Sequence, residues 1–87
     1  MATTTIPRSR IISIGGLAWQ ERQPGIRVKA IWEHPETKRQ ALMMRLEAGT
    51  ELPLHRHVGD ELIFVLEGEV SDNFGAVTAG NMGYRPN

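Results

Sequence analysis

The chain is 87 residues long, carries ten basic and ten acidic side chains and contains no cysteine. This length allows one small domain with a thin core, and the absence of thiols excludes disulfides and thiolate metal sites. Balanced charge without a basic stripe argues against nucleic-acid binding, and the longest apolar run, residues 62–66, is too short to cross a bilayer. We therefore expect a cytoplasmic protein that binds neither nucleic acid nor membrane.

The first half of the chain has the pattern of short strands separated by turns. Residues 1–9 are expected to form a flexible N-terminus, and the β-branched run at 11–14 predicts a first strand that ends at a Gly-Gly pair. After a turn signal at 23–25, alternating apolar and polar residues predict a half-buried strand over 26–32. A second turn is expected over 33–37.

Residues 41–47, ALMMRLE, fit either a helix or a strand. Their composition favours a helix. Alternation instead places Leu42, Met44 and Leu46 on one face, as in a strand, and turn signals flank both ends. We predict a strand, because β-structure on either side commonly overrides a weak local preference.

The second half continues the β pattern. A turn is expected over 48–50, and residues 61–66 form the most strand-like run of the chain. This run is apolar on both faces, which predicts that both faces are covered. Residues 72–75 have the composition of a hairpin tip. About seven short strands at this spacing, without a convincing helix, predict an all-β sandwich or barrel.

The stretch HRHVGDE, residues 55–61, holds the candidate site. His55 and His57 share a face of an extended chain, because side chains two residues apart point the same way. Glu61 follows a glycine-containing turn, at the start of the next strand. Two imidazole nitrogens and one carboxylate oxygen suit Zn, Fe(II), Mn, Co or Ni. The alternative is that the three side chains are unrelated and solvated, as we expect for the isolated His34.

The spacing around these residues resembles a known family. From Gly49 to Gly68 the chain reads glycine, five residues, H-x-H, three residues, glutamate, six residues, glycine, which is similar to the first conserved motif of the cupin superfamily. Further similarity to the ChrR-type cupin domain lies in Trp19, Pro24-Gly25-Ile26, Lys29, Arg45 and the segment VLEGE. The resemblance implies a cupin domain over residues 10–87, built as a double-stranded β-helix or jelly-roll barrel. It also implies His55, His57 and Glu61 as ligands of a divalent metal ion (Zn, Fe(II), Mn or Ni).

The second motif of the family would supply a fourth ligand, a histidine. Residues 80–87, GNMGYRPN, match only the first half of that motif, so the expected histidine position lies beyond Asn87. We therefore expect a C-terminally incomplete barrel with unpaired strand edges, and a homo-oligomer, most simply a dimer, that covers them. The alternative is that the 87 residues are a fragment of a longer protein.

The resemblance leaves three functions open. The first is a mononuclear metalloenzyme of dioxygenase type that acts on a small organic molecule, with Ile63 and Val65 shaping its pocket. The second is a zinc-binding regulatory or sensor cupin, similar to the domain found in ChrR-type anti-sigma factors. The third is a binding cupin that needs no metal. Arg45 is expected either to bind an anionic substrate or, as arginines more commonly do, to be exposed or ion-paired.

Overall fold

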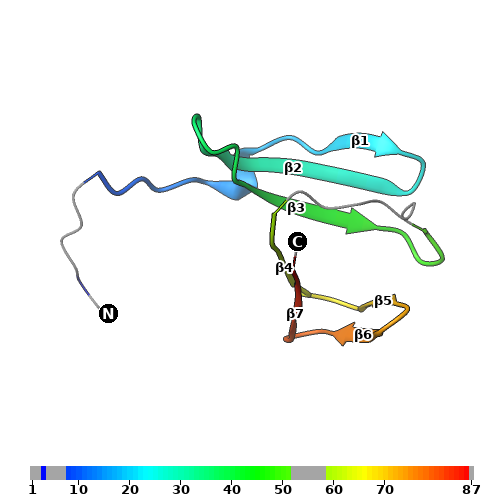
Figure 1. Cartoon of the computed structure of the whole chain (residues 1–87). Coiled ribbons are helices and arrows are strands. Elements are labelled where there is room, and N and C mark those ends of the chain that lie inside the picture. Colours follow the sequence, from blue (N-terminus) through cyan, green and yellow to red (C-terminus); the bar gives the residue numbers. More distant parts are fainter. Residues whose placement is uncertain (1–2, 4–7, 52–58, 87) are drawn as a thin grey trace. The chain divides into compact units, whose positions relative to one another are not determined.

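The computed structural model of the chain describes residue 3 and the ranges 8–51 and 59–86, which fall into two compact units, residues 1–52 and 53–87 (Figure 1). We call these the N-terminal and the C-terminal unit. The described residues form seven β-strands and one 3-10 turn at Ile14–Gly16. The all-β class predicted from the sequence is thus confirmed. The single domain over residues 10–87, preceded by a flexible stretch, stays a prediction.

Membrane-spanning helices were not expected from the sequence. Within the described ranges the structure contains no helix that is both long and apolar enough to cross a bilayer.

The N-terminal unit is an antiparallel sheet of three strands in the order β1-β2-β3, with β1 at Gln20–Gln23, β2 at Ile26–Glu33 and β3 at Gln40–Leu46 (Figure 1). The predicted turns lie between them. Gly25 closes the first turn with a φ of 83°, a left-handed conformation that favours glycine. The second turn is held by the His34 N–H, which donates to the Arg39 carbonyl over 2.7 Å.

The ambiguous segment is a strand, as predicted. In β3 the apolar residues Leu46, Met44 and Leu42 lie directly opposite Ile26, Val28 and Ala30 of β2. Pairing with β2 therefore outweighs the helical preference of the segment, because cross-strand contacts stabilise a strand where a helix of seven residues would be marginal.

The strand predicted at 11–14 is wrong. Its last residue, Ile14, begins the 3-10 turn, and Ile11 is almost fully exposed. The carbonyl of Ile14 accepts a hydrogen bond from the Lys29 ammonium over 3.1 Å, and that ammonium lies 4.8 Å from the centre of the Trp19 ring. The segment is thus fixed by a side-chain contact and a cation–π contact to β2, and not by a strand ladder.

The C-terminal unit consists of two pairs of antiparallel strands. One pair joins β4 at Glu61–Phe64 to β7 at Met82–Arg85, and the other joins β5 at Glu69–Asp72 to β6 at Gly75–Thr78. The predicted hairpin tip lies between β5 and β6, where the Asp72 carboxylate accepts hydrogen bonds from the N–H groups of Phe74 and Gly75 over 2.8 and 3.2 Å. This is the local turn chemistry that aspartate provides.

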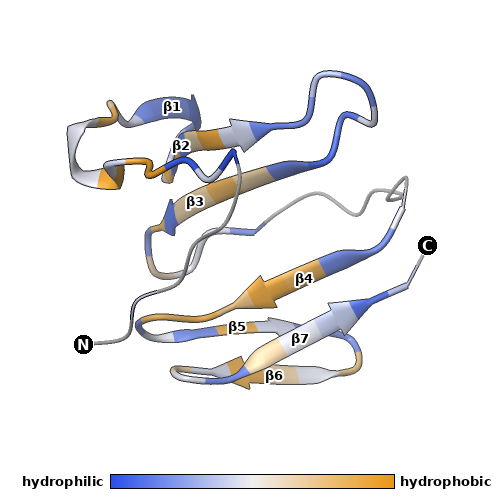
Figure 2. Ribbon diagram, turned by 90° about the vertical axis from the view of Figure 1, so that its left-hand side faces the viewer, coloured by the Kyte–Doolittle hydropathy of each residue, from blue (hydrophilic) through white to orange (hydrophobic). Residues whose placement is uncertain are grey.

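The two faces of β4 differ strongly in exposure, and the hydropathy colouring of this strand is largely hydrophobic (Figure 2). Val65, just after the strand, is buried and Ile63 is half-buried. On the other face Leu62, Phe64 and Leu66 are exposed. The prediction that both faces of this run are covered is therefore wrong for the chain as described, because burial follows the partners in space and not the apolar pattern alone.

Candidate metal site

Of the three predicted ligands, Glu61 is described by the structure, whereas His55 and His57 lie outside the described residues. Among the described residues, no three histidine, cysteine, aspartate or glutamate side chains gather closely enough to hold a metal ion. The three-ligand site therefore stays a prediction, and what the structure adds is the setting of Glu61.

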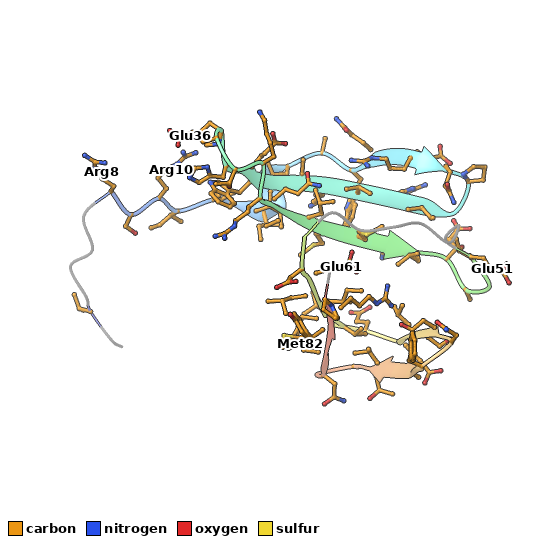
Figure 3. The ribbon with its side chains drawn as sticks, in the orientation of Figure 1. Arg8, Arg10, Glu36, Glu51, Glu61 and Met82 are labelled. Carbon is orange, nitrogen blue, oxygen red and sulfur yellow. The ribbon has the colours of Figure 1, made fainter. Side chains whose placement is uncertain are left out.

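Glu61 begins β4 and lies directly opposite Arg85 of β7 (Figure 3). Side chains alternate along a strand, so Glu61 shares its face with Ile63 and Val65. This face is directed towards the β5–β6 pair, because an added Cβ atom on Gly83, which is opposite Ile63, would come within 3.0 Å of the Val77 side chain. The carboxylate of Glu61 is thus half-buried on the inner face of its unit.

A charged cluster surrounds this carboxylate. The Arg85 guanidinium lies 3.5 Å from a carboxylate oxygen of Glu61 and 3.0 Å from one of Asp72, so it bridges β4 and β5 from β7. Each of the three side chains is about one-third exposed. Charge-assisted N–H···O bonds are typically about 2.7–2.9 Å long, so Arg85 is held more closely by Asp72 than by Glu61.

Neither Arg85 nor Asp72 was predicted as part of the site. The reason is that β7 was not predicted as a strand, because Gly80 and Gly83 have the composition of turn residues. Two hydrogen bonds, from the Val65 N–H to the Asn81 carbonyl and from the Gly80 N–H to the Val65 carbonyl, extend the β4–β7 ladder past these glycines. Only this pairing brings Arg85 opposite Glu61.

The electrostatics of Asp72 favour its charged form. The N–H of Phe74, and after it the positive charge of Arg85 and the N–H of Gly75, hold the pKa of the Asp72 carboxyl below its ordinary value, against an opposing effect of desolvation. Because the pKa is lower in the folded chain than in the unfolded chain, the ionised carboxylate stabilises the fold above the ordinary pKa. This stabilisation is lost as pH falls through the folded-state pKa.

We expect Asp72→Asn to be less stable than the unchanged chain at pH 7, and the difference to shrink as pH falls below about 3.9. Asparagine keeps an oxygen that can accept from Phe74 but loses the ion pair with Arg85. Urea denaturation followed by circular dichroism at pH 7 and pH 3 measures this. Glu69→Gln, on the exposed side of the same strand, is the matched control and should change little. A stability difference that is the same at both pH values would contradict the role given to the Asp72 charge.

Tyr84 lies next to the cluster on β7 but faces the other way, opposite Leu62. Its hydroxyl is hydrogen-bonded to Asp60, and this bond, together with the negative charge of Asp60 and some desolvation, raises the pKa of the Tyr84 phenol. The residue that precedes Glu61 is thereby tied to β7 as well. Asp60 and Glu61, which are consecutive in the sequence, therefore both contact side chains of β7.

The remaining histidine, His34, has a local structural role. Its Nδ1 accepts hydrogen bonds from the N–H groups of Glu36 and Thr37, each over 3.2 Å. Its ring packs edge-to-face with the Trp32 ring, and the two ring centres are 5.8 Å apart. His34 therefore organises the turn after β2 and is half-buried, which makes it less solvated than the sequence predicts.

The setting of Glu61 is compatible with ligation of a cation. A carboxylate has about four lone-pair sites, and the Arg85 guanidinium lies 3.5 Å from one oxygen of Glu61. A carboxylate oxygen is also a ligand type that Zn, Mn and Fe(II) accept. The described part of the donor set thus fits a divalent metal ion.

Comparison with known proteins gives one match. A family model described as the ChrR cupin-like domain matches residues 8–87, which is nearly the whole chain. Comparisons with curated proteins and with solved structures each return no match.

Proposed function

The chain belongs to the ChrR cupin-like domain family, and from this premise we propose that it binds one divalent metal ion through His55, His57 and Glu61. The observation that carries the proposal is the place of Glu61. It is half-buried on the inner face of its unit, at the spacing from the H-x-H pair that the cupin motif requires. A carboxylate turned to the outer face of β4 would have counted against it.

The donor set of two imidazoles and one carboxylate accepts Zn, Fe(II), Mn or Ni. When bound, such an ion supplies Lewis-acid polarisation of a substrate oxygen or, in the case of iron, chemistry with dioxygen. The apolar side chains of Ile63 and Val65 lie on the face of Glu61 and would keep water from that side of the ion. Our best assignment is therefore a small mononuclear metalloenzyme of dioxygenase type acting on a small organic molecule.

The family description also supports a second function, a zinc-binding regulatory cupin that acts on a partner protein. The two differ in the metal they require. An oxygenase needs a redox-active ion, whereas a sensor of this kind takes zinc, which has no redox chemistry. A cupin that works without metal is the third outcome.

Metal content tests the proposal. We expect protein purified without added metal to contain close to one equivalent of a divalent ion by elemental analysis, and His57→Ala to contain less than about a tenth of that. Iron or manganese in the unchanged chain supports the oxygenase, and zinc supports the regulatory cupin. His34→Ala is the matched control, because His34 has a local structural role. Equal metal in His57→Ala and the unchanged chain would refute the assignment of ligands.

The expected homo-oligomer also stays a proposal, and the outer face of the β4–β7 pair is its best-supported interface. Five large side chains between 57% and 66% exposed form this outer patch, namely Leu62, Phe64, Leu66, Met82 and Tyr84. The register places Leu62 beside Tyr84 and Phe64 beside Met82, so the patch is contiguous. Contiguous exposed apolar patches typically mark interaction sites.

A second copy of the chain is the occupant that fits this patch. With roughly 120 Å² exposed on each large side chain, the five residues, two of them aromatic, present on the order of 600 Å² to a partner. Two copies would bury about 1,200 Å², the lower end of specific interfaces. In a twofold pair the same patch meets itself, and none of its five side chains is charged, although the Asp60 carboxylate is bonded to the Tyr84 hydroxyl.

A further inference from the structure

Two arginines face each other near one end of the β2–β3 ladder, beside the turn that joins β1 to β2. Arg27 of β2 and Arg45 of β3 are directly paired in the antiparallel register, and both are exposed. Side chains paired in this way have Cβ atoms about 4.5–5.5 Å apart, and like charges at such positions destabilise a sheet. Lys29, two residues after Arg27, adds a third positive charge to the same face.

Within the described residues neither guanidinium forms an ion pair with a carboxylate, although the charge of Glu21, opposite Arg27, offsets part of the repulsion. The ion pairs there with N···O distances up to 4 Å join Lys38 to Glu33 and Arg85 to its two carboxylates. Glu21 lies opposite Arg27 in the β1–β2 register, yet its carboxylate is not within that distance of the guanidinium. The Lys29 ammonium is engaged by the Ile14 carbonyl and the Trp19 ring.

A hollow of about 220 Å³ lies beside the two arginines, lined by Gly25, Arg27, Arg45, Leu46 and Glu47. Gly25, one of the lining residues, is packed closely against Thr50. It has no side chain, and an added Cβ atom would approach the Thr50 hydroxyl to 2.7 Å, so a larger residue cannot be placed there without a shift. The volume corresponds to roughly seven water molecules in the liquid, which suits a small organic molecule and not a macromolecule.

We propose that Arg27 and Arg45 bind the carboxylate group of a small organic acid in this hollow. The planar fork of a guanidinium matches a carboxylate with two parallel hydrogen bonds, and two opposed forks can share one such group. The Glu47 carboxylate in the same wall repels a second negative charge, which favours a singly charged carboxylate over a phosphate. The site lies in the N-terminal unit and uses none of the predicted metal ligands, so it goes beyond the proposed metal function.

The test is a titration of the full chain, freed of metal beforehand on a chelating resin, with sodium acetate and sodium glycolate, followed by ¹⁵N–¹H NMR and by thermal unfolding. Sodium chloride at equal ionic strength controls for screening, and sodium phosphate tests the alternative anion. We expect the backbone amides around Arg27 and Arg45 to shift in a saturable way. At ten times the dissociation constant, Tm should rise by roughly 5–10 °C above the chloride control.

Arg45→Gln separates a binding role from a structural one. If the pair binds an anion, the variant loses at least tenfold in acetate affinity, while its own Tm at low salt rises because the repulsion between the two arginines is gone. If Arg45 instead supports the sheet, the variant has a lower Tm and unchanged acetate affinity, which would overturn the proposal. Arg39→Gln, in the turn between β2 and β3, is the matched control and should leave acetate binding unchanged.

Two further outcomes would also refute the proposal. One is a set of acetate shifts no larger than those with chloride at the same ionic strength. The other is a stronger response to phosphate than to acetate, which would place a different anion in the hollow. Because the protein is metal-free throughout, neither outcome depends on whether the chain binds a metal ion.

Discussion

Glu61→Gln is expected to lower the affinity for a divalent ion by at least about 100-fold and to leave the stability of the metal-free chain within about 1 kcal/mol. The loss of affinity is large because one of three protein ligands is removed. Removing a residue that only hydrogen-bonds to a ligand typically lowers metal affinity about 10–100-fold, and removing a ligand itself should cost more. The change in stability is small because the ion pair that the substitution removes is a weak one. Glu61 and Arg85 are 3.5 Å apart and about one-third exposed, and such pairs contribute little to stability.

The measurement is a competition titration with a metal-binding dye, together with urea denaturation in EDTA. Glu67→Gln is the matched control, since it makes the same chemical change in the bend after β4, at an exposed position. A change in metal affinity of less than tenfold in Glu61→Gln would exclude this carboxylate as a ligand. A large loss of stability in EDTA would show instead that Glu61 acts mainly through its charge pair.

Local patterns in the sequence predict most of the strands correctly. Alternation in residues 26–32 predicts β2, and the Asp-Asn-Phe-Gly tip predicts the β5–β6 hairpin, because each depends on neighbours in the sequence. Residues 11–14 show the limit of this approach. Their β-branched side chains are suited to a strand, but no strand pairs with them in the described chain, and a ladder needs a partner.

The candidate site likewise has a part that the sequence predicts and a part that depends on strand pairing. His55, His57 and Glu61 can be predicted as ligands from spacing alone, because they are close in sequence and match a family pattern, and this assignment stays a prediction. The Arg85–Asp72 cluster around Glu61 could not be, because it depends on which residue of β7 lies opposite Glu61. A shift of one residue in that register would turn Arg85 to the outer face.

The opposed pair of arginines has the same origin. Arg27 and Arg45 are eighteen positions apart in the sequence, and each alone has the composition of an ordinary exposed strand residue. Their direct pairing follows from the register in which Val28 meets Met44 and Lys29 meets Met43. Features formed by two distant strands therefore become visible only once the register is known.

Phe64→Glu is expected to convert a dimer into a monomer, with the dissociation constant rising at least about 100-fold. The side chain lies in the middle of the outer patch, next to Met82 in the register, where a twofold pair would bring two new carboxylates together. Central aromatic residues commonly carry more than 2 kcal/mol of an interface. Because Phe64 is 60% exposed in the single chain, the change should cost that chain little stability.

Phe74→Glu is the matched control. Phe74 is 92% exposed at the tip of the β5–β6 hairpin, outside the patch, so the same chemical change there should leave the dimer intact. Light scattering after size-exclusion chromatography, from 1 to 100 μM, gives the mass of each protein. An unchanged chain that stays monomeric throughout would refute the interface. Equal weakening by both substitutions would show that added charge, and not the patch, controls association. Phe74 is the more exposed of the two rings. If only Phe64→Glu dissociates the dimer, the interface therefore depends on the contiguous apolar surface around Phe64 and not on the exposure of a single aromatic ring.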